Sequence, residues 1–525
     1  DVATERVRYV APSVDRDFAP RWSPDGKQIV FIRAPGSRNY LPVIPQRPQP
    51  WAIWLADAVT AEARELWHSG KGLNDSLPPF AAKSLKFGVN ERIVLASEMD
   101  GRNHLYVVGA YSHIDEQPVL LTPGDFDVED VTLSPDGTTV VYTSNEGDVD
   151  RRHIWAASLS HGQDSARKWN PMPQTALTQG ATIEWNPLML SDNMRVVCFG
   201  STATSPAMPY YLTGAWPTNV VGARVISNKE RVMPYHTGEL PLVAFKGRQM
   251  IAPNALPSDF PSDKLVEPQQ VTFRSDDGLE IHGQLFVSKR RPASGRGPAL
   301  IFAHGGPPRQ MMLGFHYMYY YHNSYAENQY LASLGYVVLS VNYRLGSMYG
   351  RAFREAPNSG WRGSFEYKDV LAGAKYLQSL PYVDSKRIGI WGGSYGGLMT
   401  ALALSRNSDV FAAGVDFHGV HDWSVFLRRS APDTAPDYKE ALKLAYDSSP
   451  IASVATWKSP VLLMHGDDDR NVAFQQTTDL VQRLRENHVP FEEIIFPDEI
   501  HDFLLWKTWI RGYKATAEFF DRKFF

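Results

Sequence analysis

The chain has 525 residues, of which 43% are hydrophobic and 21% charged, and its formal net charge is −4. This length exceeds what one hydrophobic core usually serves, so two domains are expected, with the composition of a soluble globular protein. A weakly acidic chain without a basic cluster argues against nucleic acid as a partner. No stretch approaches the roughly 18 apolar residues that span a bilayer, so no membrane span is predicted.

The first ten residues are charged and lack an apolar core, so no signal peptide is predicted. Because the chain begins with Asp1 rather than methionine, a removed leader stays open. We therefore expect a soluble protein, with the cytoplasm favoured and a periplasmic or secreted location left open. The sequence does not decide whether the chain forms a homo-oligomer.

The first half of the chain contains an internal repeat. Trp22–Phe31 and Leu133–Tyr142 share an S-P-D-G turn followed by a strand pattern, with weaker echoes at Leu85–Asn90 and Glu184–Pro187. In such a turn proline presets φ and glycine takes the positive φ. Short strands repeated every 40–50 residues or so are typical of propeller blades. We therefore predict an all-β propeller over residues 1–255, with five to six blades if each takes about 45 residues; the propeller is either short or incomplete in this sequence.

The same half offers little for metal or cofactor chemistry. Cys198 is the only cysteine, so no internal disulfide can form, and its strand-like surroundings predict a buried small hydrophobe. No Cys/His cluster has the spacing of metal ligands, and no phosphate-binding glycine loop is present. We expect no metal and no cofactor.

A proline-rich linker over 256–270 precedes a second domain over 271–525. Its first strands, 270–274 and 279–286, flank a D-G turn and predict a hairpin. Apolar runs near 298–303, 336–341, 388–392, 413–417, 460–465 and 491–496 then alternate with helical stretches. That alternation predicts a mostly parallel, doubly wound sheet, the α/β-hydrolase architecture.

Within this domain, Gly392–Gly396 reads G-x-S-x-G between an apolar strand and a helix-forming run. Strand, tight turn and helix in this order predict a nucleophile elbow, which presents the Ser394 hydroxyl above the sheet. The helix N-terminus behind it favours developing negative charge.

A nucleophilic serine needs a base and an orienting acid, which follow it in the order Asp, His in such folds. Asp467, Asp468 and Asp469 follow a buried strand, and spacing alone leaves all three open. Of the two histidines beyond them, His501 follows a strand end, whereas His488 ends a helix. We predict His501 as the base.

Residues from about 267 to 525 resemble the catalytic domain of the prolyl oligopeptidase family of serine peptidases. The segments that carry the resemblance are His304–Pro307, Asn342–Arg344, Gly392–Gly397, His465–Val472 and Pro497–His501. The family pattern H-G-x-x-D falls on Asp469, so the resemblance implies a triad of Ser394, Asp469 and His501. The family usually has glycine before its histidine, where this chain has Ile500.

Acyl transfer also needs N–H donors for the oxyanion. The residue after the nucleophile, Tyr395, supplies one backbone N–H, and the loop containing Gly305 and Gly306 is the candidate for the second. The H-G-G-P form of this loop resembles the acylaminoacyl-peptidase branch, where a backbone N–H serves. The alternative is a plain strand-to-helix turn.

The predicted function is a serine peptidase acting on short peptides, of acylaminoacyl-peptidase or aminopeptidase type. The resemblance implies that the propeller excludes folded proteins. A dipeptidyl peptidase of the family is the first alternative. The family's dipeptidyl peptidases bind the substrate amine with a Glu-Glu pair in the propeller, whereas the only adjacent glutamates here, Glu492–Glu493, lie on a hydrolase strand, which disfavours this alternative. An esterase with the same triad and a catalytically inactive propeller platform are the others.

Two parts of the sequence offer candidates for substrate contact. Glu98 lies in a propeller stretch common in the dipeptidyl peptidase branch, although a turn acid is the simpler interpretation. Trp423 and the run Met318–Tyr321 could line an apolar pocket for the substrate side chain, or could pack in the core.

Overall fold

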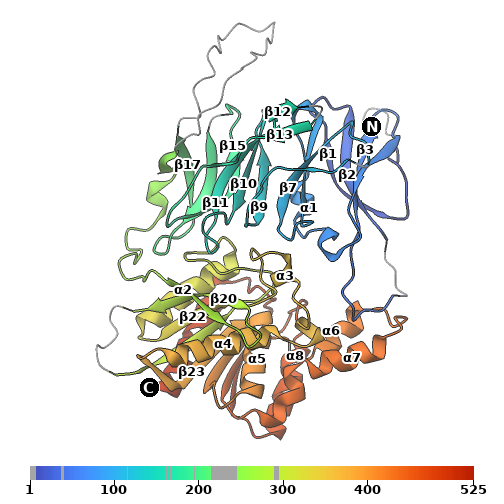
Figure 1. Cartoon of the computed structure of the whole chain (residues 1–525). Coiled ribbons are helices and arrows are strands. Elements are labelled where there is room, and N and C mark those ends of the chain that lie inside the picture. The colour runs from blue at the N-terminus through green and yellow to red at the C-terminus, as the bar shows by residue number, and fades with distance from the viewer. Residues whose placement is uncertain are drawn as a thin grey trace. The chain divides into compact units, whose positions relative to one another are not determined.

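The computed structural model describes residues 7–36, 41–114, 116–160, 162–165, 168–193, 195–214, 245–288 and 295–525. The chain divides into two compact units (Figure 1). The N-terminal unit contains 1–36, 48–200 and 207–258, and the C-terminal unit contains 37–47, 201–206 and 259–525. The linker limits predicted from the sequence stay a prediction. Within the described residues, no helix combines the length and apolarity needed to cross a membrane.

The N-terminal unit is a propeller-type array of four-stranded sheets, four of them in the part of the chain that the structure describes. The strands, in the order of their sheets, are β1 (Arg16–Trp22), β2 (Gln28–Ala34), β3 (Ala52–Asp57) and β4 (Ala63–His68); β5 (Lys86–Phe87), β6 (Arg92–Ser97), β7 (His104–Gly109) and β8 (Val119–Leu120); β9 (Val128–Leu133), β10 (Thr139–Ser144), β11 (His153–Ser158) and β14 (Thr175–Ala176); β15 (Ile183–Met189), β16 (Val196–Ser201), β17 (Met208–Gly214) and β18 (Phe245–Met250). A separate hairpin pairs β12 (Gly162–Ser165) with β13 (Lys168–Pro171).

Consecutive sheets share hydrophobic cores, as propeller blades do. Successive side chains of a strand point to opposite faces, so Leu95 of β6 packs toward the first sheet and Val94 toward the third. Val140 and Val141 of β10 repeat this division. Cys198 is buried in the core between the third and fourth sheets, as predicted.

The two S-P-D-G segments form matching turns between paired strands. The Ser23 hydroxyl donates to the Asp25 carboxylate at 2.6 Å, and Ser134 repeats this bond to Asp136 at 2.7 Å. The glycine that closes each turn has φ of +72° or +73°, a conformation that favours glycine.

The first, third and fourth blades are longer than the period of about 45 residues that predicted five to six blades. The first blade carries the segment from 35 to 51 between β2 and β3, the third adds the β12–β13 hairpin, and the fourth has residues 215–244 between its last two strands. Residues 215–244 lie outside the described part of the chain. These added segments take up residues that the predicted period had counted toward a fifth or sixth blade.

The C-terminal unit is built on one sheet with the order β19-β20-β22-β21-β23-β24-β25-β26. The first three strands pair antiparallel and the remainder are parallel, which confirms the predicted hairpin and the mostly parallel sheet. The strands are β19 (Gln269–Arg274), β20 (Glu280–Val287), β21 (Gly297–Ala303), β22 (Val337–Asn342), β23 (Val383–Gly393), β24 (Ala413–Phe417), β25 (Val461–Gly466) and β26 (Phe491–Phe496).

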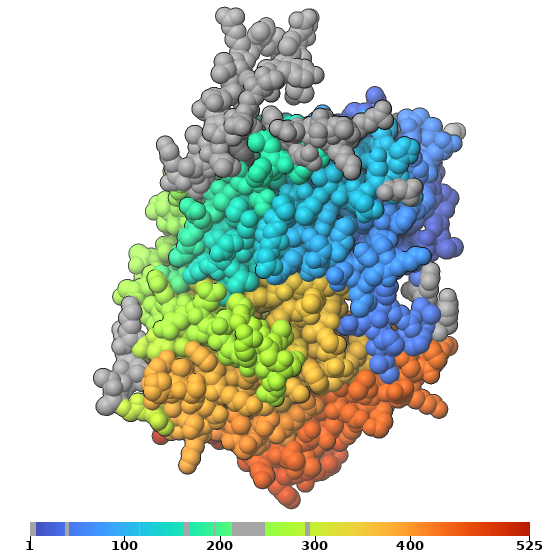
Figure 2. Space-filling model, in the orientation of Figure 1, coloured from blue at the N-terminus to red at the C-terminus, as the bar shows by residue number. Residues whose placement is uncertain are grey.

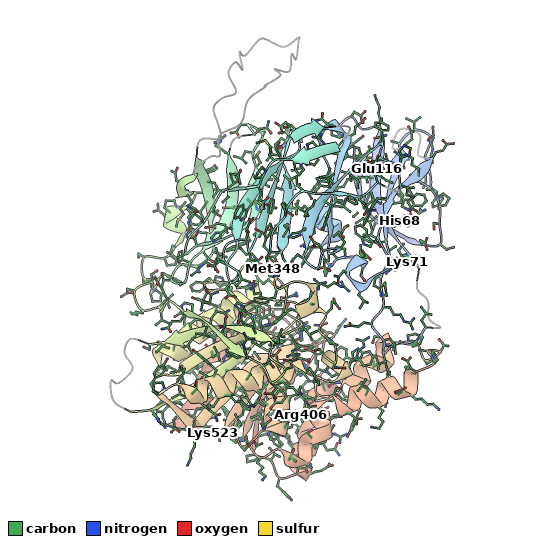
Figure 3. All side chains as sticks on the ribbon, viewed as in Figure 1. His68, Lys71, Glu116, Met348, Arg406 and Lys523 are labelled. Carbon is green, nitrogen blue, oxygen red and sulfur yellow. The ribbon has the colours of Figure 1, made fainter. Side chains whose placement is uncertain are left out.

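Helices cover both faces of this sheet. Residues of α4, α5 and α8, such as Tyr367, Leu402 and Leu480, pack on one face, whereas Leu331 of α2 and Phe520 of α9 pack on the other. Arg406, labelled in Figure 3, ends α5. The helices are α1 (Ala81–Ser84, N-terminal unit), α2 (Tyr319–Ser333), α3 (Arg351–Arg354), α4 (Glu366–Ser379), α5 (Tyr395–Arg406), α6 (Trp423–Ser430), α7 (Tyr438–Asp447), α8 (Gln475–Glu486) and α9 (Trp506–Phe524). Short 3-10 helices are η1 (Leu73–Asp75), η2 (Val89–Glu91), η3 (Pro253–Ala255), η4 (Gly360–Arg362) and η5 (Pro450–Thr456).

Candidate active site

Ser394 occupies a strained turn between β23 and α5. Its backbone has φ +59° and ψ −117°, a conformation that residues other than glycine rarely adopt and that concentrates at functional sites. The neighbouring positions must be glycine, because a Cβ at Gly396 would clash with the Ala303 carbonyl and one at Gly393 with the Tyr320 hydroxyl. The turn is fixed by the Ser394 N–H, which donates to the Phe417 carbonyl at 2.9 Å.

Ser394, His501 and Asp469 lie in one hydrogen-bonded chain. His501 Nε2 is 2.9 Å from Ser394 Oγ, and His501 Nδ1 is 2.6 Å from Asp469 Oδ2. The two partners come from the turns that follow β25 and β26, at the carboxyl edge of the parallel strands, where open α/β sheets place their ligands. This arrangement has the connectivity of a Ser–His–Asp triad.

The environment of Asp469 keeps its side chain ionised. Burial alone would raise the pKa of the Asp469 carboxyl, but hydrogen bonds from His465 and His501 outweigh it and hold that pKa well below its usual range. The second oxygen accepts the backbone N–H groups of Asn471 and Val472 at 2.8 and 2.9 Å. A fixed carboxylate holds the proton of His501 on Nδ1 and leaves Nε2 free to accept from Ser394.

The other acids and the other histidine of this region make different contacts. Asp467 accepts the Asp498 N–H at 2.7 Å, and the half-exposed Asp468 pairs with Arg470 at 3.1 Å. His488 is exposed at the end of α8.

Of the two loop glycines, Gly305 approaches the serine. A Cβ on Gly305 would lie 3.2 Å from the Ser394 Cβ and 2.8 Å from the Gly393 carbonyl, so only glycine allows this proximity. The groups nearest to the equivalent position of Gly306 are instead Arg309 and Pro308. Tyr395 begins α5, where the first backbone N–H groups of a helix have no partner within the helix.

His304 supports this loop from behind. It is fully buried, its ring stacks on Tyr343 with centroids 4.3 Å apart, and its Nδ1 lies 2.8 Å from the Gly305 carbonyl. The Tyr343 hydroxyl in turn donates to the His304 carbonyl. Burial lowers the pKa of His304 to about 4, so the ring is neutral at physiological pH.

Sequence reasoning missed His418, which follows β24 directly. Its buried ring packs 4.4 Å from the His501 ring, and its Nε2 is 3.3 Å from the Tyr320 hydroxyl. Burial, and then the charges of His501 and His465, hold the pKa of His418 well below its usual range. The available signal was its place at the carboxyl end of a parallel strand.

His465 completes a group of three histidines around Asp469. Its Nε2 faces two acceptors, Asp469 Oδ2 at 3.1 Å and the Val472 carbonyl at 3.0 Å, and therefore carries the proton; its Nδ1 accepts from Thr477. The ligand atoms of His418, Asp469 and His501 lie within 4.8 Å of one another, a spacing that also suits a metal ion. Both His501 nitrogens are already engaged in the Ser394–Asp469 chain, so the geometry favours a hydrolase centre.

Five apolar residues, which we call the apolar wall, belong to or pack on the core that contains the residue after the serine. Tyr395, Val420 and Val472 belong to one buried core, against which Trp423 and Phe426 pack. The Trp423 ring is 5.7 Å from that of Tyr395, so the structure brings this predicted substrate residue next to the residue after Ser394.

The remaining substrate candidates lie elsewhere. Glu98 belongs to the N-terminal unit, in the turn after β6, and is fully buried. In the run Met318–Tyr321, Tyr320 and Tyr321 approach Gly393 and Gly305 respectively, whereas Tyr319 is 55% exposed.

An α/β sheet that carries serine on an elbow and aspartate and histidine after its last two strands defines an α/β-hydrolase with a serine triad. Residues 321–525 match the prolyl oligopeptidase family, and residues 61–173 match the dipeptidyl peptidase IV N-terminal region. Residues 321–525 thus carry the catalytic region of a prolyl oligopeptidase family serine peptidase.

Two curated relatives illustrate how similar known proteins are to this chain. Dipeptidyl aminopeptidase BIII of Pseudoxanthomonas mexicana is 26% identical over 75% of this chain and 59% of its own length. Dipeptidyl peptidase 4 of Sus scrofa is 31% identical over 46% of this chain and 31% of its own length. The chain thus spans about half the length, or less, of these curated relatives.

Solved structures share the fold over nearly the whole chain. A Mycobacterium tuberculosis puromycin-hydrolysing peptidase covers 98% of this chain, and the match covers 72% of that chain, with a TM-score of 0.72 and 20% identity. An acylaminoacyl peptidase in complex with Z-Gly-Gly-Phe-chloromethyl ketone covers 97%, and the match covers 88% of that chain, with a TM-score of 0.60 and 19% identity.

Proposed function

We propose that this chain is a serine peptidase that hydrolyses short peptides through an acyl-enzyme on Ser394. The observation that carries the proposal is the continuous hydrogen-bond chain from Ser394 Oγ through His501 to a buried Asp469. Each group stands at the distance and in the order that nucleophilic catalysis by serine requires.

The mechanism follows from these positions. His501 Nε2 accepts the proton of Ser394 as Oγ attacks the substrate carbonyl carbon, and Asp469 stabilises the imidazolium that forms. The imidazolium then donates that proton to the leaving amine, which departs and leaves an ester on Ser394. Water, deprotonated by His501, attacks this ester; the acid product leaves and the serine regains its proton.

Two backbone groups are proposed to hold the oxyanion of each tetrahedral intermediate. They are the N–H of Tyr395, at the free start of α5, and that of Gly305, whose backbone lies against Ser394. A preorganised donor of this kind is worth about 3 kcal/mol in the transition state. The neutral His304 beside Gly305 adds no charge to the loop.

For the substrate, we propose an aminoacyl or N-acylaminoacyl peptide with an apolar side chain before the scissile bond. The wall of Tyr395, Val420, Val472, Trp423 and Phe426 supports the apolar side chain. The H-G-G-P loop supports the acylaminoacyl or aminopeptidase type.

Dipeptidyl release is the second candidate. Relatives named dipeptidyl aminopeptidase or dipeptidyl peptidase favour it. It would require an acidic group that binds the substrate amine, and Glu98 is the residue that the sequence offers.

A chromogenic anilide panel tests the proposal: free aminoacyl, N-acetyl-aminoacyl, and dipeptidyl with proline second, each with a matched ester. Ser394→Ala is the test variant, with Ser379→Ala, an exposed serine at the end of α4, as its control. We expect anilide turnover by the wild type and the control, and a loss on the order of a millionfold in Ser394→Ala. Turnover of esters alone would indicate an esterase, and activity that survives in Ser394→Ala would reject the mechanism.

A further inference from the structure

A short segment between β2 and β3 of the first blade belongs by its contacts to the C-terminal unit. We call residues 41–47 the arm. In Figure 1 it is the blue trace beside α6 and α7, and in Figure 2 blue atoms adjoin orange ones at the same place. The arm thus brings propeller sequence to the unit that holds Ser394.

The backbone of the arm is held from both sides at two consecutive residues. The N–H groups of Val43 and Ile44 both donate to the Asp437 carboxylate, at 2.8 to 3.0 Å. On the other side, Arg362 Nε donates to the Ile44 carbonyl at 2.6 Å and its terminal nitrogen to the Val43 carbonyl at 2.8 Å. Charged partners make such hydrogen bonds about twice as strong as neutral ones. The segment is therefore docked at a defined register.

The side chains of the arm pack against the same buried cluster as two tryptophans. Val43 and Ile44 join a cluster that contains Trp361 and Trp423 and is centred on buried residues of α6 and α7. Trp423 also touches Tyr395, the residue after the nucleophile, at 5.7 Å between rings. The arm is thus connected to Trp423, a residue of the apolar wall, through the buried cluster that both contact.

Hydrogen bonds form a second connection between the arm and Tyr395. Arg362 ends η4, whose first residue, Gly360, donates its N–H to the Glu366 carboxylate at 3.0 Å. That fully buried carboxylate also accepts the Tyr395 hydroxyl at 2.6 Å. Both routes end at Tyr395, and neither includes Ser394, His501 or Asp469.

We infer that the arm is a specificity element that positions Trp423 and Tyr395 and so fixes the width of the apolar wall that receives the substrate side chain. This inference rests on the proposed function. The arm acts through the ring and hydroxyl of Tyr395 rather than through its backbone N–H or the triad. Loosening the arm therefore changes how well a side chain fits and leaves the chemical step in place. The substrates affected are those with large apolar side chains, which use the most wall surface.

The test removes the anchor and compares substrates of different size. Asp437→Ala deletes the acceptor of both arm N–H groups, and Asp433→Ala removes an exposed acid four residues earlier as the matched control. Arg362→Met deletes the donors on the opposite side while keeping an apolar stem. Values of kcat and KM are measured for phenylalanyl and alanyl anilides that are otherwise identical.

We expect both anchor variants to raise KM for the phenylalanyl substrate about tenfold relative to the alanyl one, with kcat changed less than about threefold. The control should match the wild type. An equal effect on both substrates, or a loss confined to kcat, would overturn the inference.

Labelling of Ser394 by fluorophosphonates separates this result from failure of the proposed function. If the wild type reacts with the reagent but turns over no anilide, the proposed function fails. Then the labelling rates of a small alkyl and a bulky aryl fluorophosphonate test the arm by themselves. The anchor variants should slow the bulky reagent selectively, and an unchanged ratio of rates would reject the arm as a specificity element.

Discussion

Replacing His304 should change the pH dependence of stability in a calculable way. The ring is fully buried, its Nδ1–H donates to the Gly305 carbonyl, and its Nε2 has no hydrogen-bond partner among the residues that the structure describes. Protonation would add a buried N–H without an acceptor, which is why burial lowers the pKa of His304 from 6.5 to about 4. The unfolded chain therefore takes up this proton at a higher pH than the folded chain.

The sign follows from that difference. Above pH 6.5 the ring is neutral in both states and contributes no pH dependence. As the pH falls from 6.5 to about 4, the unfolded state gains a proton that the folded state refuses, so the free energy of unfolding decreases. At about 1.4 kcal/mol per pH unit, the gap between 6.5 and about 4 amounts to about 3 kcal/mol.

His304→Phe keeps an aromatic ring for stacking on Tyr343 and cannot titrate. At pH 7.5 it should be less stable than the wild type by about 1 kcal/mol, because one neutral hydrogen bond is lost. At pH 4.5 it should be more stable by about 1–2 kcal/mol, because the protonation penalty is also removed. The assay is urea unfolding followed by tryptophan fluorescence at several pH values, with the exposed His113→Phe as control. The reasoning would be refuted if the free energies of unfolding of the wild type and of His304→Phe differed by the same amount at pH 7.5 and at pH 4.5.

Three further substitutions have defined outcomes. Asp469→Asn should lower kcat about 10⁴-fold with the fold intact by circular dichroism, because an amide facing His501 Nδ1 favours the wrong tautomer; a loss under tenfold would contradict this role. Gly393→Ala should abolish labelling of the nucleophile by a fluorophosphonate, since the added Cβ clashes with the Tyr320 hydroxyl; full labelling would contradict the packing. Arg344→Met should cost about 3–5 kcal/mol in urea unfolding, because it leaves the fully buried carboxylate of Asp369 without its ion pair; a cost below 1 kcal/mol would show that the pair is dispensable.

Local patterns predicted the frame of the C-terminal unit well. Each apolar run of the second half forms a strand, because a buried parallel strand must be apolar on both faces. The elbow was also predictable from the sequence. Glycine is required where the turn at Ser394 lies against the backbone of β21, because a Cβ there would clash with it. Strands and tight turns depend on residues that are neighbours in the sequence, so the sequence alone predicts them.

Features that depend on distant segments were not predictable. His418 reaches His501 only because β24 and β26 end at the same edge of the sheet, on either side of β25. The arm lies far in sequence from Asp437, and no local pattern marks residues 41–47 as part of another unit. The sequence left the number of blades open for a related reason, because insertions lengthen a blade without changing its turns.

The acidic run after β25 shows how the fold distinguishes residues that a pattern treats alike. A Cβ on Gly466 would clash with the Glu499 carbonyl, so the turns after β25 and β26 lie against each other. The first acid, Asp467, joins them through the Asp498 N–H. The chain then turns so that Asp468 faces solvent and Asp469 faces His501.

Two residues before His501, the Glu499 carboxylate accepts the Leu504 N–H at 2.6 Å and the Thr508 hydroxyl at 2.5 Å, which ties the histidine loop to the start of α9. His501, the proposed base, is therefore held by one turn before it and one helix after it. Ile500 stands in this loop, where the family usually has glycine. Despite its larger side chain, the His501 ring stays within hydrogen-bond distance of Asp469 and Ser394. The position of the histidine is thus set by the two acids at its flanks, Asp469 and Glu499, rather than by the residue that immediately precedes it.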